Sequence, residues 1–284
     1  MPDKPTLALL QRAGPGCSNC LQQKGVSLEQ CYEVGLARRS QKGRYYDTFR
    51  NRIIFPIQDE RQRVVGFGGR LLDGEGPKYL NTPKTRFYDK SRALYGIDRA
   101  RVAIQRAKEA VLVEGYFDVL ALRQAGFEHT VATCGTALTI EHVRRIRALT
   151  KNVLVVTDAD RAGAVAAEKA LPMFLEVGAI PWRVPLAGAK DPDELIQRDG
   201  PEAMKAVLQD KVPLVEWVVE QKLRRGGGMM GREALIEEML PLLSLLPPHG
   251  VNLIAARLGH EESILKRVVE YRAKSKHPQK SSRG

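Results

Sequence analysis

The sequence lacks long apolar runs. None of its stretches approaches the roughly 18 consecutive apolar residues that a membrane-spanning helix needs. The start, Met1–Pro5, also lacks the apolar core of a signal peptide. We therefore expect a cytoplasmic protein that has no membrane partner.

Cysteine is scarce as well. Four cysteines, Cys17, Cys20, Cys31 and Cys134, are too few and too scattered for a disulfide framework in 284 residues. Only Cys17 and Cys20 have the spacing of metal ligands, and a closed zinc site would need two more. Cys31 is one candidate, and no His precedes His129. We expect no zinc and interpret the pair as ordinary thiols in a helix or loop.

Acidic residues are few where basic residues gather. The formal net charge is +12. Residues 37–106 hold 17 Lys or Arg against 7 Asp or Glu, and residues 271–284 hold five basic residues and no acidic one. Because Lys and Arg bind phosphates and release counterions, this segmental surplus favours a polyanionic partner over a merely solvated face. The composition is otherwise that of a globular protein, at 43% hydrophobic and 27% charged residues.

The first 36 residues show helical periodicity twice, in Leu7–Gln11 and in Val26–Leu36. Ser27 is placed to begin the second helix, with Gln30 at the spacing of a capping box and Gly35 as a stop. Two short helices are therefore predicted here.

Residues 45–70 change to a β pattern. Asn51–Ile57 and Val64–Arg70 are predicted strands joined by a polar turn. The glycines at 66, 68 and 69 are followed by neither a Lys-Ser or Lys-Thr pair nor a helix, so a phosphate-binding loop is disfavoured. A close backbone approach or a bulge explains them better. Residues 76–96 then alternate aromatic and cationic side chains, a composition suited to bases and phosphates that ordinary surface turns share.

A regular alternation of strands and helices follows a polar helix at residues 98–109. Strands are expected at residues 110–114, 130–133, 152–157 and 181–185, with helices at residues 116–124, 139–148 and 162–176 and from 192 onward. Such alternation predicts a parallel sheet covered on both faces. Further helices are expected at residues 214–223, 232–246 and 252–272, with a loop at residues 224–228, which contain three consecutive glycines.

Six carboxylates lie at predicted strand ends or in the loops just after them: Glu114, Asp118, Asp158, Asp160, Asp191 and Asp193. Carboxyl ends of parallel strands share one edge, so these groups can converge. Crowded carboxylates are usually neutralised by hard cations, and Mg²⁺ or Mn²⁺ suits such oxygens. The alternative is helix capping, which Asp160 and Asp191 could each provide. Paired Mg²⁺ ions could hold a nucleotide triphosphate and activate an attacking 3′-hydroxyl.

The acidic segments resemble the toprim motifs of bacterial DnaG-type DNA primases. They are Val113–Val119, Asp158–Gly163 and Lys190–Glu194. Upstream segments resemble the basic amino-terminal part of the same polymerase core: Tyr46–Ile57, Gly66–Arg70 and Pro77–Asn81. Toprim motifs alone are shared with topoisomerases and recombination proteins, so the upstream segments make the resemblance specific to primases.

The resemblance covers about Val26–Arg272 and implies an α/β fold. A toprim parallel-sheet domain (108–205) would be flanked by a basic α+β N-terminal subdomain (1–107) and a C-terminal helical subdomain (206–272). A basic disordered tail (273–284) would follow.

The resemblance also implies a role for each group. Glu114 would be the metal-linked acid or base, Asp158 and Asp160 the principal Mg²⁺ ligands, and Asp118, Asp191 and Asp193 supporting acids. Template, nucleotide or primer would be held by Arg52, Arg70, Lys78, Tyr79, Asn81 and Lys90. The implied activity is that of a DNA-directed RNA polymerase, a nucleotidyltransferase that makes short RNA primers from ribonucleoside triphosphates on single-stranded DNA.

Two parts of such primases have no counterpart in the sequence: the zinc-binding module and the helicase-docking domain. We expect a fragment or a reduced protein, monomeric, found at bacterial replication forks, which contacts the helicase only if the missing domain is supplied. Two rivals remain. One is another toprim enzyme, a nuclease or a topoisomerase-like protein, although no motif identifies the nucleophilic Tyr of a strand-passing enzyme. The other is a non-catalytic remnant that binds single strands.

Overall fold

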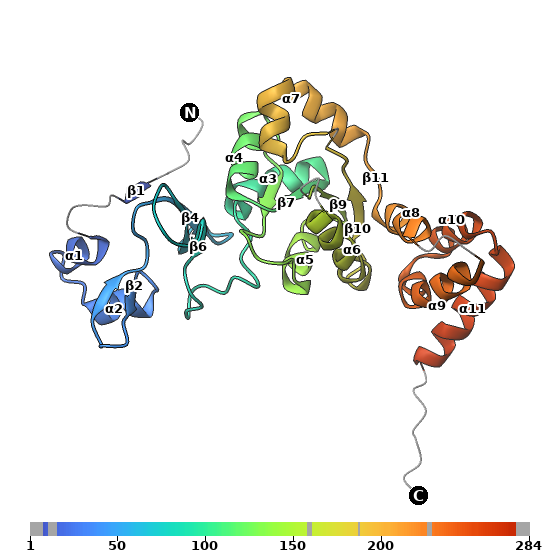
Figure 1. The fold of residues 1–284 in the computed structure, drawn as a ribbon, viewed down its shortest axis with the longest axis horizontal. Helices are drawn as coiled ribbons and strands as arrows, with labels where there is room; N and C mark the ends of the chain where they lie inside the picture. The colour runs from blue at the N-terminus through green and yellow to red at the C-terminus, as the bar shows by residue number, and fades with distance from the viewer. Residues whose placement is uncertain (1–7, 11–15, 158–160, 187, 226–228, 277–284) are drawn as a thin grey trace, which may run out of the picture.

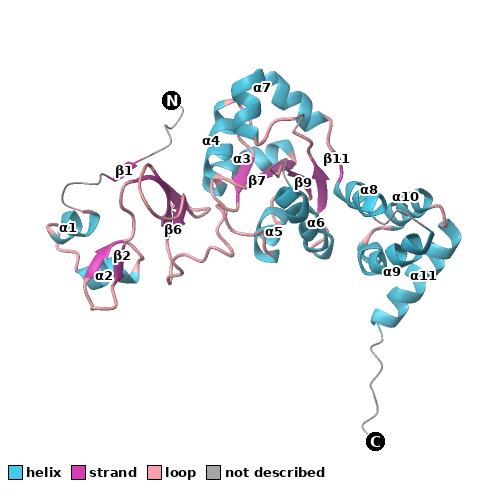
Figure 2. Ribbon diagram, viewed as in Figure 1, coloured by secondary structure: helices cyan, strands magenta, loops and turns pink. Residues whose placement is uncertain are grey.

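The computed structural model describes residues 8–10, 16–157, 161–186, 188–225 and 229–276. The chain passes through three parts in order: small sheets with short helices, a parallel sheet covered by helices, and a group of helices (Figures 1 and 2). This is the α/β arrangement that the sequence predicts. No helix of the described residues is both long and apolar enough to cross a bilayer.

The first part contains two antiparallel sheets. A four-stranded sheet has the order β1-β4-β5-β6, and β2 pairs with β3. The elements are β1 (Ala8–Leu10), α1 (Cys17–Gln22), α2 (Leu28–Glu33), β2 (Ala37–Arg39), β3 (Tyr45–Asp47), β4 (Arg52–Gln58), β5 (Val64–Leu71) and β6 (Tyr79–Asn81).

The short N-terminal helices follow the sequence in part. The capping box of α2 is confirmed, because Ser27 accepts from the Gln30 backbone and Gln30 accepts from the Ser27 backbone. Gly35, at a φ of 77°, lies just beyond the C-cap of α2. The predicted helix at Leu7–Gln11 is wrong: Ala8–Leu10 is an edge strand paired with β4. Three apolar residues cannot distinguish helix from strand, so the available sheet edge decides.

The glycines of β5 allow the close approach that the sequence favours. A Cβ on Gly68 would lie 2.3 Å from the Tyr116 ring and hydroxyl, and a Cβ on Gly66 would lie 2.8 Å from the Tyr88 ring. The register between β4 and β5 also shifts at Ile57 and Gln58, which is the expected irregularity. The glycine backbone of β5 therefore serves as a surface on which aromatic rings pack.

The second part is a five-stranded sheet in the order β11-β10-β9-β7-β8. All pairs are parallel except that of β11 with β10. Its elements are α3 (Ile97–Ala107), β7 (Glu109–Val113), α4 (Tyr116–Gln124), β8 (Thr130–Ala132), α5 (Ile140–Arg147), β9 (Asn152–Val155), α6 (Arg161–Glu176), β10 (Ile180–Arg183), α7 (Pro192–Gln209) and β11 (Val212–Pro213).

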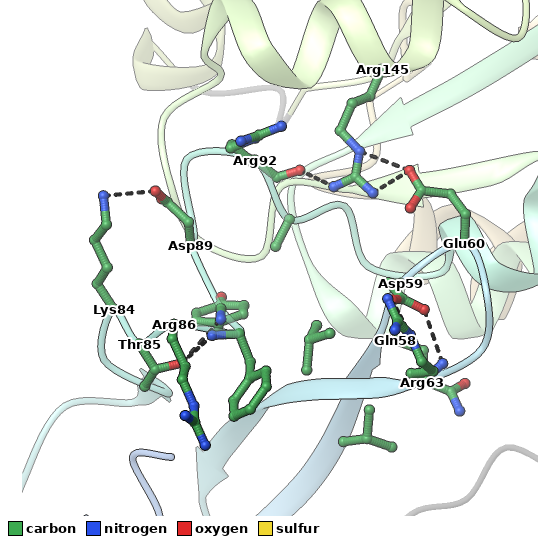
Figure 3. A pocket seen from close by; sticks show the side chains of 15 residues that line it. Gln58, Asp59, Glu60, Arg63, Lys84, Thr85, Arg86, Asp89, Arg92 and Arg145 are labelled. Atoms are coloured by element: carbon green, nitrogen blue, oxygen red, sulfur yellow. Dashed lines mark hydrogen bonds and ion pairs between the residues drawn. The ribbon is translucent and has the colours of Figure 1, made fainter. Parts of the chain in front are cut away.

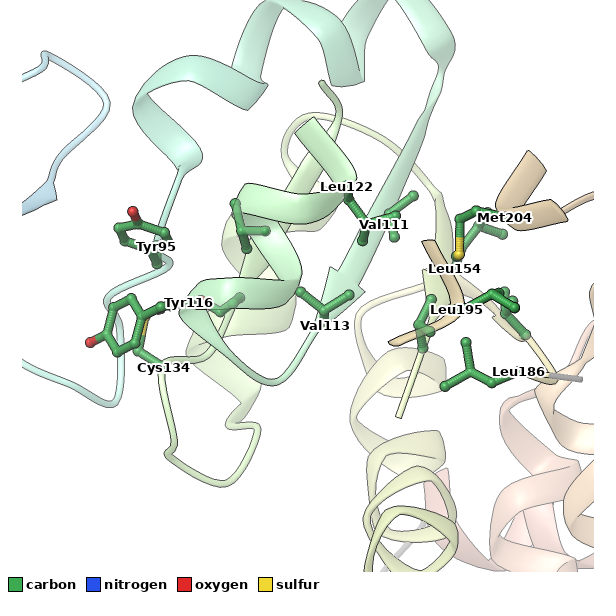
Figure 4. Close-up of a cluster of buried hydrophobic side chains, with 14 of the residues drawn as sticks. Tyr95, Val111, Val113, Tyr116, Leu122, Cys134, Leu154, Leu186, Leu195 and Met204 are labelled. Carbon is green, nitrogen blue, oxygen red and sulfur yellow. Dashed lines mark hydrogen bonds between the residues drawn. The ribbon is translucent and has the colours of Figure 1, made fainter. Parts of the chain in front are cut away.

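Both faces of this sheet are covered, as predicted. Along β7, Val111 and Val113 pack in one cluster with residues of α4 and α7, including Leu122 and Met204 (Figure 4). Leu112 points into a second cluster with residues of α3, α5 and α6. The first cluster also contains Phe55 and Tyr88, so the antiparallel sheet and the parallel sheet share one core.

The third part is helical: α8 (Leu214–Arg225), α9 (Met229–Leu245), α10 (Pro248–Leu258) and α11 (Glu261–Lys276). The single helix predicted at residues 252–272 is wrong, because Gly259 ends α10 in the left-handed region at a φ of 77°. Residues 224–225 and 273–276, predicted as loop and tail, are helical, because α8 continues through Arg225 and α11 through Lys276. The rest of the predicted loop and tail, residues 226–228 and 277–284, lies outside the described residues. The predicted boundary between the toprim domain and the helical subdomain, at residue 205, falls inside α7. The domain bounds stay a prediction.

Side chains at the start of α5 and within it donate hydrogen bonds to three consecutive backbone carbonyls in the loop of residues 90–92. The Thr139 hydroxyl donates to the Ser91 carbonyl at 2.5 Å, His142 Nε2 to the Lys90 carbonyl at 3.0 Å, and Arg145 to the Arg92 carbonyl. Residues three apart share one side of a helix, so this side of α5 fixes residues 90–92.

We expect Gly68→Ala to destabilise the protein by about 1–3 kcal/mol, because the new methyl group overlaps the buried Tyr116 ring. Chemical denaturation checks this. Gly250→Ala is the matched control: the nearest side-chain atom to its Cβ is at 3.5 Å, and the site is helical, so stability should hold or rise. An unchanged midpoint for Gly68→Ala would contradict the packing described here.

We expect His142 to make stability depend on pH. Burial lowers the pKa of His142, opposed by its bond to the Lys90 carbonyl, so the folded protein holds the neutral imidazole. Its contribution is complete above the unfolded pKa of about 6.5 and is lost as the pH falls from there toward the folded pKa. Unfolding free energies of wild type and His142→Gln should therefore converge between about pH 7.5 and pH 5.5. Exposed His260→Gln is the control and should show no such convergence.

Candidate functional site

The carboxyl ends of three neighbouring strands border one cavity of about 270 Å³. Glu114 directly follows β7 and is exposed. The loop of residues 133–138 follows β8, and Thr157 follows β9. The structure therefore gathers strand ends at the edge where the sequence places its carboxylates.

Thr157 gives this edge an unusual polar group. Its side-chain oxygen is buried and has no hydrogen-bond partner among the described residues. The next residues are the predicted ligands Asp158 and Asp160, which lie outside the described residues. A buried hydroxyl that has no partner in the described ranges and lines the same cavity as Glu114 fits a site that a bound group completes.

The supporting acids also have local structural roles. Asp118, only 8% exposed, accepts from the Gly115 backbone at 2.9 Å at the start of α4. Asp191 caps α7 by accepting from the Glu194 backbone at 2.9 Å, and Asp193 accepts from the Gln197 side chain at 2.8 Å. The capping alternative therefore holds for Asp191, and Asp118 has a similar role.

No group of three or more His, Cys, Asp or Glu side chains in the described ranges is arranged to hold a metal ion. The two strongest predicted ligands, Asp158 and Asp160, are not among those ranges. The carboxylates and the Thr157 hydroxyl are nevertheless the hard oxygen donors that Mg²⁺ and Mn²⁺ prefer. The chemistry of these donors therefore suits such an ion, and the ligand set remains a prediction.

We call the sheet edge that carries Glu114 and the start of α4 the acidic edge. Tyr79 of β6 connects this edge to Arg70 of β5. Its pKa is raised chiefly by burial, opposed by Arg70 and reinforced by the negative charges of Asp118 and Asp191. Arg70 donates to the Tyr79 hydroxyl at 3.3 Å, and its guanidinium lies 4.7 Å from the ring centre of Phe117, the residue before Asp118. Segments far apart in sequence thus place a phenol within the electrostatic range of two acids, and a cation against the ring that precedes one of them.

Asn81 joins the two sheets. Its amide donates to the Cys134 carbonyl at 2.7 Å, and its oxygen accepts from the Tyr116 hydroxyl at 2.7 Å. The Tyr116 ring is stacked on Phe55 at 4.6 Å between ring centres, and burial raises the Tyr116 pKa well above its ordinary value. These bonds hold Asn81 in place, and its predicted binding role is untested.

The other predicted basic residues take separate places. Arg52 is 5% exposed and donates to the Gly69 carbonyl at 3.1 Å, although it also lines a cavity of about 430 Å³ with Arg38 and Arg50. Lys78 and Lys90 are exposed, the latter in the loop that α5 holds. Arg52 therefore supports the sheet from within, whereas the two lysines face solvent.

Sequence reasoning missed Arg183. It ends β10, is 8% exposed, and its pKa is lowered by burial, opposed by the charge of Glu114. Its guanidinium lies 5.4 Å from the Trp217 ring centre. The signal was a lone cation at the end of an otherwise apolar strand beside the acidic edge.

Comparison with known proteins agrees with this geometry. Residues 8–101 match the family "DNA primase catalytic core, N-terminal domain", and residues 111–196 match the family "Toprim-like". A DNA primase of Synechococcus elongatus is 40% identical over 87% of this chain, and one of Staphylococcus aureus is 40% identical over 72%. The matched regions span 38% and 36% of those proteins, so this chain corresponds to well under half of each.

Solved structures show the same arrangement. A DNA primase domain from Pseudomonas aeruginosa is 34% identical, with a TM-score of 0.81, over 92% of this chain and 86% of that one. The RNA polymerase domain of Mycobacterium tuberculosis primase DnaG is 31% identical, with a TM-score of 0.77, over 89% of this chain and 84% of that one. Because both the basic sheet and the acidic edge fall within these matches, the chain belongs to the DnaG-type DNA primase family, whose catalytic core it contains.

Proposed function

We propose that this chain is a template-directed RNA polymerase, a nucleotidyltransferase that joins ribonucleoside triphosphates into short RNA primers on single-stranded DNA. The observation that carries the proposal is the position of Arg70, whose guanidinium lies 4.7 Å from the ring centre of Phe117, the residue before Asp118, and donates to the Tyr79 hydroxyl at 3.3 Å. Phosphoryl transfer needs cations for the nucleotide phosphates and acids at the reacting centre, and here β5 carries a cation to the start of α4, which carries an acid.

In this proposal the basic residues bind phosphates and Glu114 transfers a proton. Arg70 and Lys78 would hold the triphosphate, since guanidinium and ammonium groups bind phosphate oxygens. Arg38 and Arg50, in the cavity of about 430 Å³, would hold the DNA backbone. Glu114 would take the proton of the primer 3′-hydroxyl, and Arg183 would favour its ionised form.

Divalent cations would be held by Asp158, Asp160 and Glu114, with Asp118, Asp191 and Asp193 in support. Bound Mg²⁺ or Mn²⁺ would neutralise phosphate charge and lower the pKa of the attacking hydroxyl. The carboxylates position such an ion, and α4 and α7 fix two of them by their caps.

The proposed binding partners are inferred from solved relatives. One solved relative is a DnaG primase catalytic domain bound to single-stranded DNA, 34% identical with a TM-score of 0.78. We propose single-stranded DNA, ribonucleotides and the RNA primer as ligands, in the bacterial cytoplasm at replication forks. We propose a monomer that contacts the replicative helicase only through a further domain.

Two rival functions make different predictions. A topoisomerase-like or nuclease activity would relax or cut supercoiled DNA. A non-catalytic remnant would bind single strands with strong salt dependence and incorporate no nucleotide. Incubation with supercoiled plasmid, and with single-stranded template plus labelled ribonucleotides, separates all three.

Glu114→Gln should reduce primer synthesis by about 100-fold or more, because the amide cannot accept a proton. The measurement is incorporation of labelled ribonucleotides on a single-stranded template. Glu202→Gln changes a carboxylate that is 86% exposed and should leave the rate unchanged. Full activity in Glu114→Gln would remove this residue from the reaction.

Chelation of divalent cations should abolish primer synthesis, and added Mg²⁺ or Mn²⁺ should restore it. The double variant Asp158→Ala, Asp160→Ala should stay inactive with either ion, because its ligands are gone. Binding of a labelled single strand, measured in parallel, should persist in the variant. Activity of the double variant equal to wild type would refute the assignment.

A further inference from the structure

A third cavity lies apart from the acidic edge. Its volume is about 870 Å³, and it is bounded by the turn between β4 and β5, the loop of residues 84–93 and Arg145 of α5 (Figure 3). No residue of this lining borders the cavity beside Glu114 or the one lined by Arg52. It lies at the opposite end of the β4–β5 hairpin from Arg52.

The charges of this lining leave cations in excess. Each of its three acids has a basic partner: Asp59 with Arg63 at 2.6 Å, Asp89 with Lys84 at 2.8 Å, and Glu60 with Arg145. The pKa of Asp89 is held well below its usual range by Lys84, so this acid stays ionised and paired. The lining contains no further acid to neutralise Arg86 and Arg92.

One of these cations, Arg86, forms an exposed stacked pair with its neighbour Phe87. Phe87 is 53% exposed, and the Arg86 guanidinium lies 4.6 Å from its ring centre. The Thr85 hydroxyl accepts from the backbone of Phe87 at 3.2 Å and of Tyr88 at 3.0 Å, which fixes the turn. Tyr88 is 1% exposed and anchors the turn against β5.

The other end of the same loop is held by α5. Thr139, His142 and Arg145 bind the carbonyls of residues 90–92, so the loop is anchored on both sides of Phe87. Arg145 is also paired with Glu60 across the cavity (Figure 3). The wall that carries the stacked pair is thus preorganised, which lowers the entropic cost of binding.

We propose that this cavity is a binding site for single-stranded nucleic acid, in which a base stacks on the Arg86–Phe87 pair and a backbone phosphate meets Arg92. Base stacking on aromatic rings beside cations is how single strands are held without sequence preference. The inference rests on the proposed function, because it assumes a nucleic-acid substrate. It assigns the strand a contact beyond the acidic edge, in the same loop as Lys90.

The test is the affinity of the full chain for a fluorescein-labelled oligodeoxynucleotide, measured by anisotropy over a range of salt. Phe87→Ala should weaken binding by about tenfold or more, from the loss of one stacking contact. Phe87→Tyr should retain the affinity. Arg92→Ala should lower the slope of log affinity against log salt by about one. Arg101→Ala, an exposed cation on α3, is the matched control for a contact elsewhere.

A second measurement locates the contact. An oligonucleotide that carries 5-iodouracil should crosslink to the peptide that contains Phe87. Wild-type affinity in Phe87→Ala, or crosslinks confined to residues 38–77, would overturn the proposal. Neither result depends on catalysis, so primer synthesis by the same preparation tests the proposed function separately.

Discussion

The acidic edge depends on the insertion of one tyrosine between two sheets. Tyr116 follows Glu114 by two residues, lies over the Gly68 backbone and donates to Asn81. The start of α4 is thereby held in a fixed position against the antiparallel sheet that carries Arg70 and Tyr79. Only a glycine leaves room for the ring, so the spacing of the glycines in β5 is a condition for bringing acids and cations together.

Several polar groups that the sequence marked as ligands are held by internal bonds. Arg52 donates within its own sheet, Asn81 links the sheets, and Asp118 and Asp191 cap helices. A side chain fixed by such bonds presents its remaining surface in one orientation, which is what positioning a charged substrate requires. Local structure and chemistry can therefore use the same residues, and neither role excludes the other.

The alternation of strands and helices was predictable because each buried strand ends at a polar residue and each helix carries one apolar face. The capping box at Ser27 was predictable because it is local. The edge strand at Ala8–Leu10, the bridge through Asn81 and the grip of α5 on residues 90–92 were not, since each depends on a partner distant in sequence. Gly259 is a residue at which a helix can end, but the apolar residues on both sides of it keep a helical periodicity, so one continuous helix was predicted.

Helix α8 extends the electrostatics of the acidic edge into the helical part. Leu214 and Val218 pack against the sheet, whereas the adjacent Val219 packs in the helical cluster. Trp217 of the same helix contacts the guanidinium of Arg183, which lies in the field of Glu114. A change in the position of α8 would therefore change the surroundings of Arg183. The surroundings of a buried cation that interacts with Glu114 thus depend on the position of a helix that carries no acid of the site.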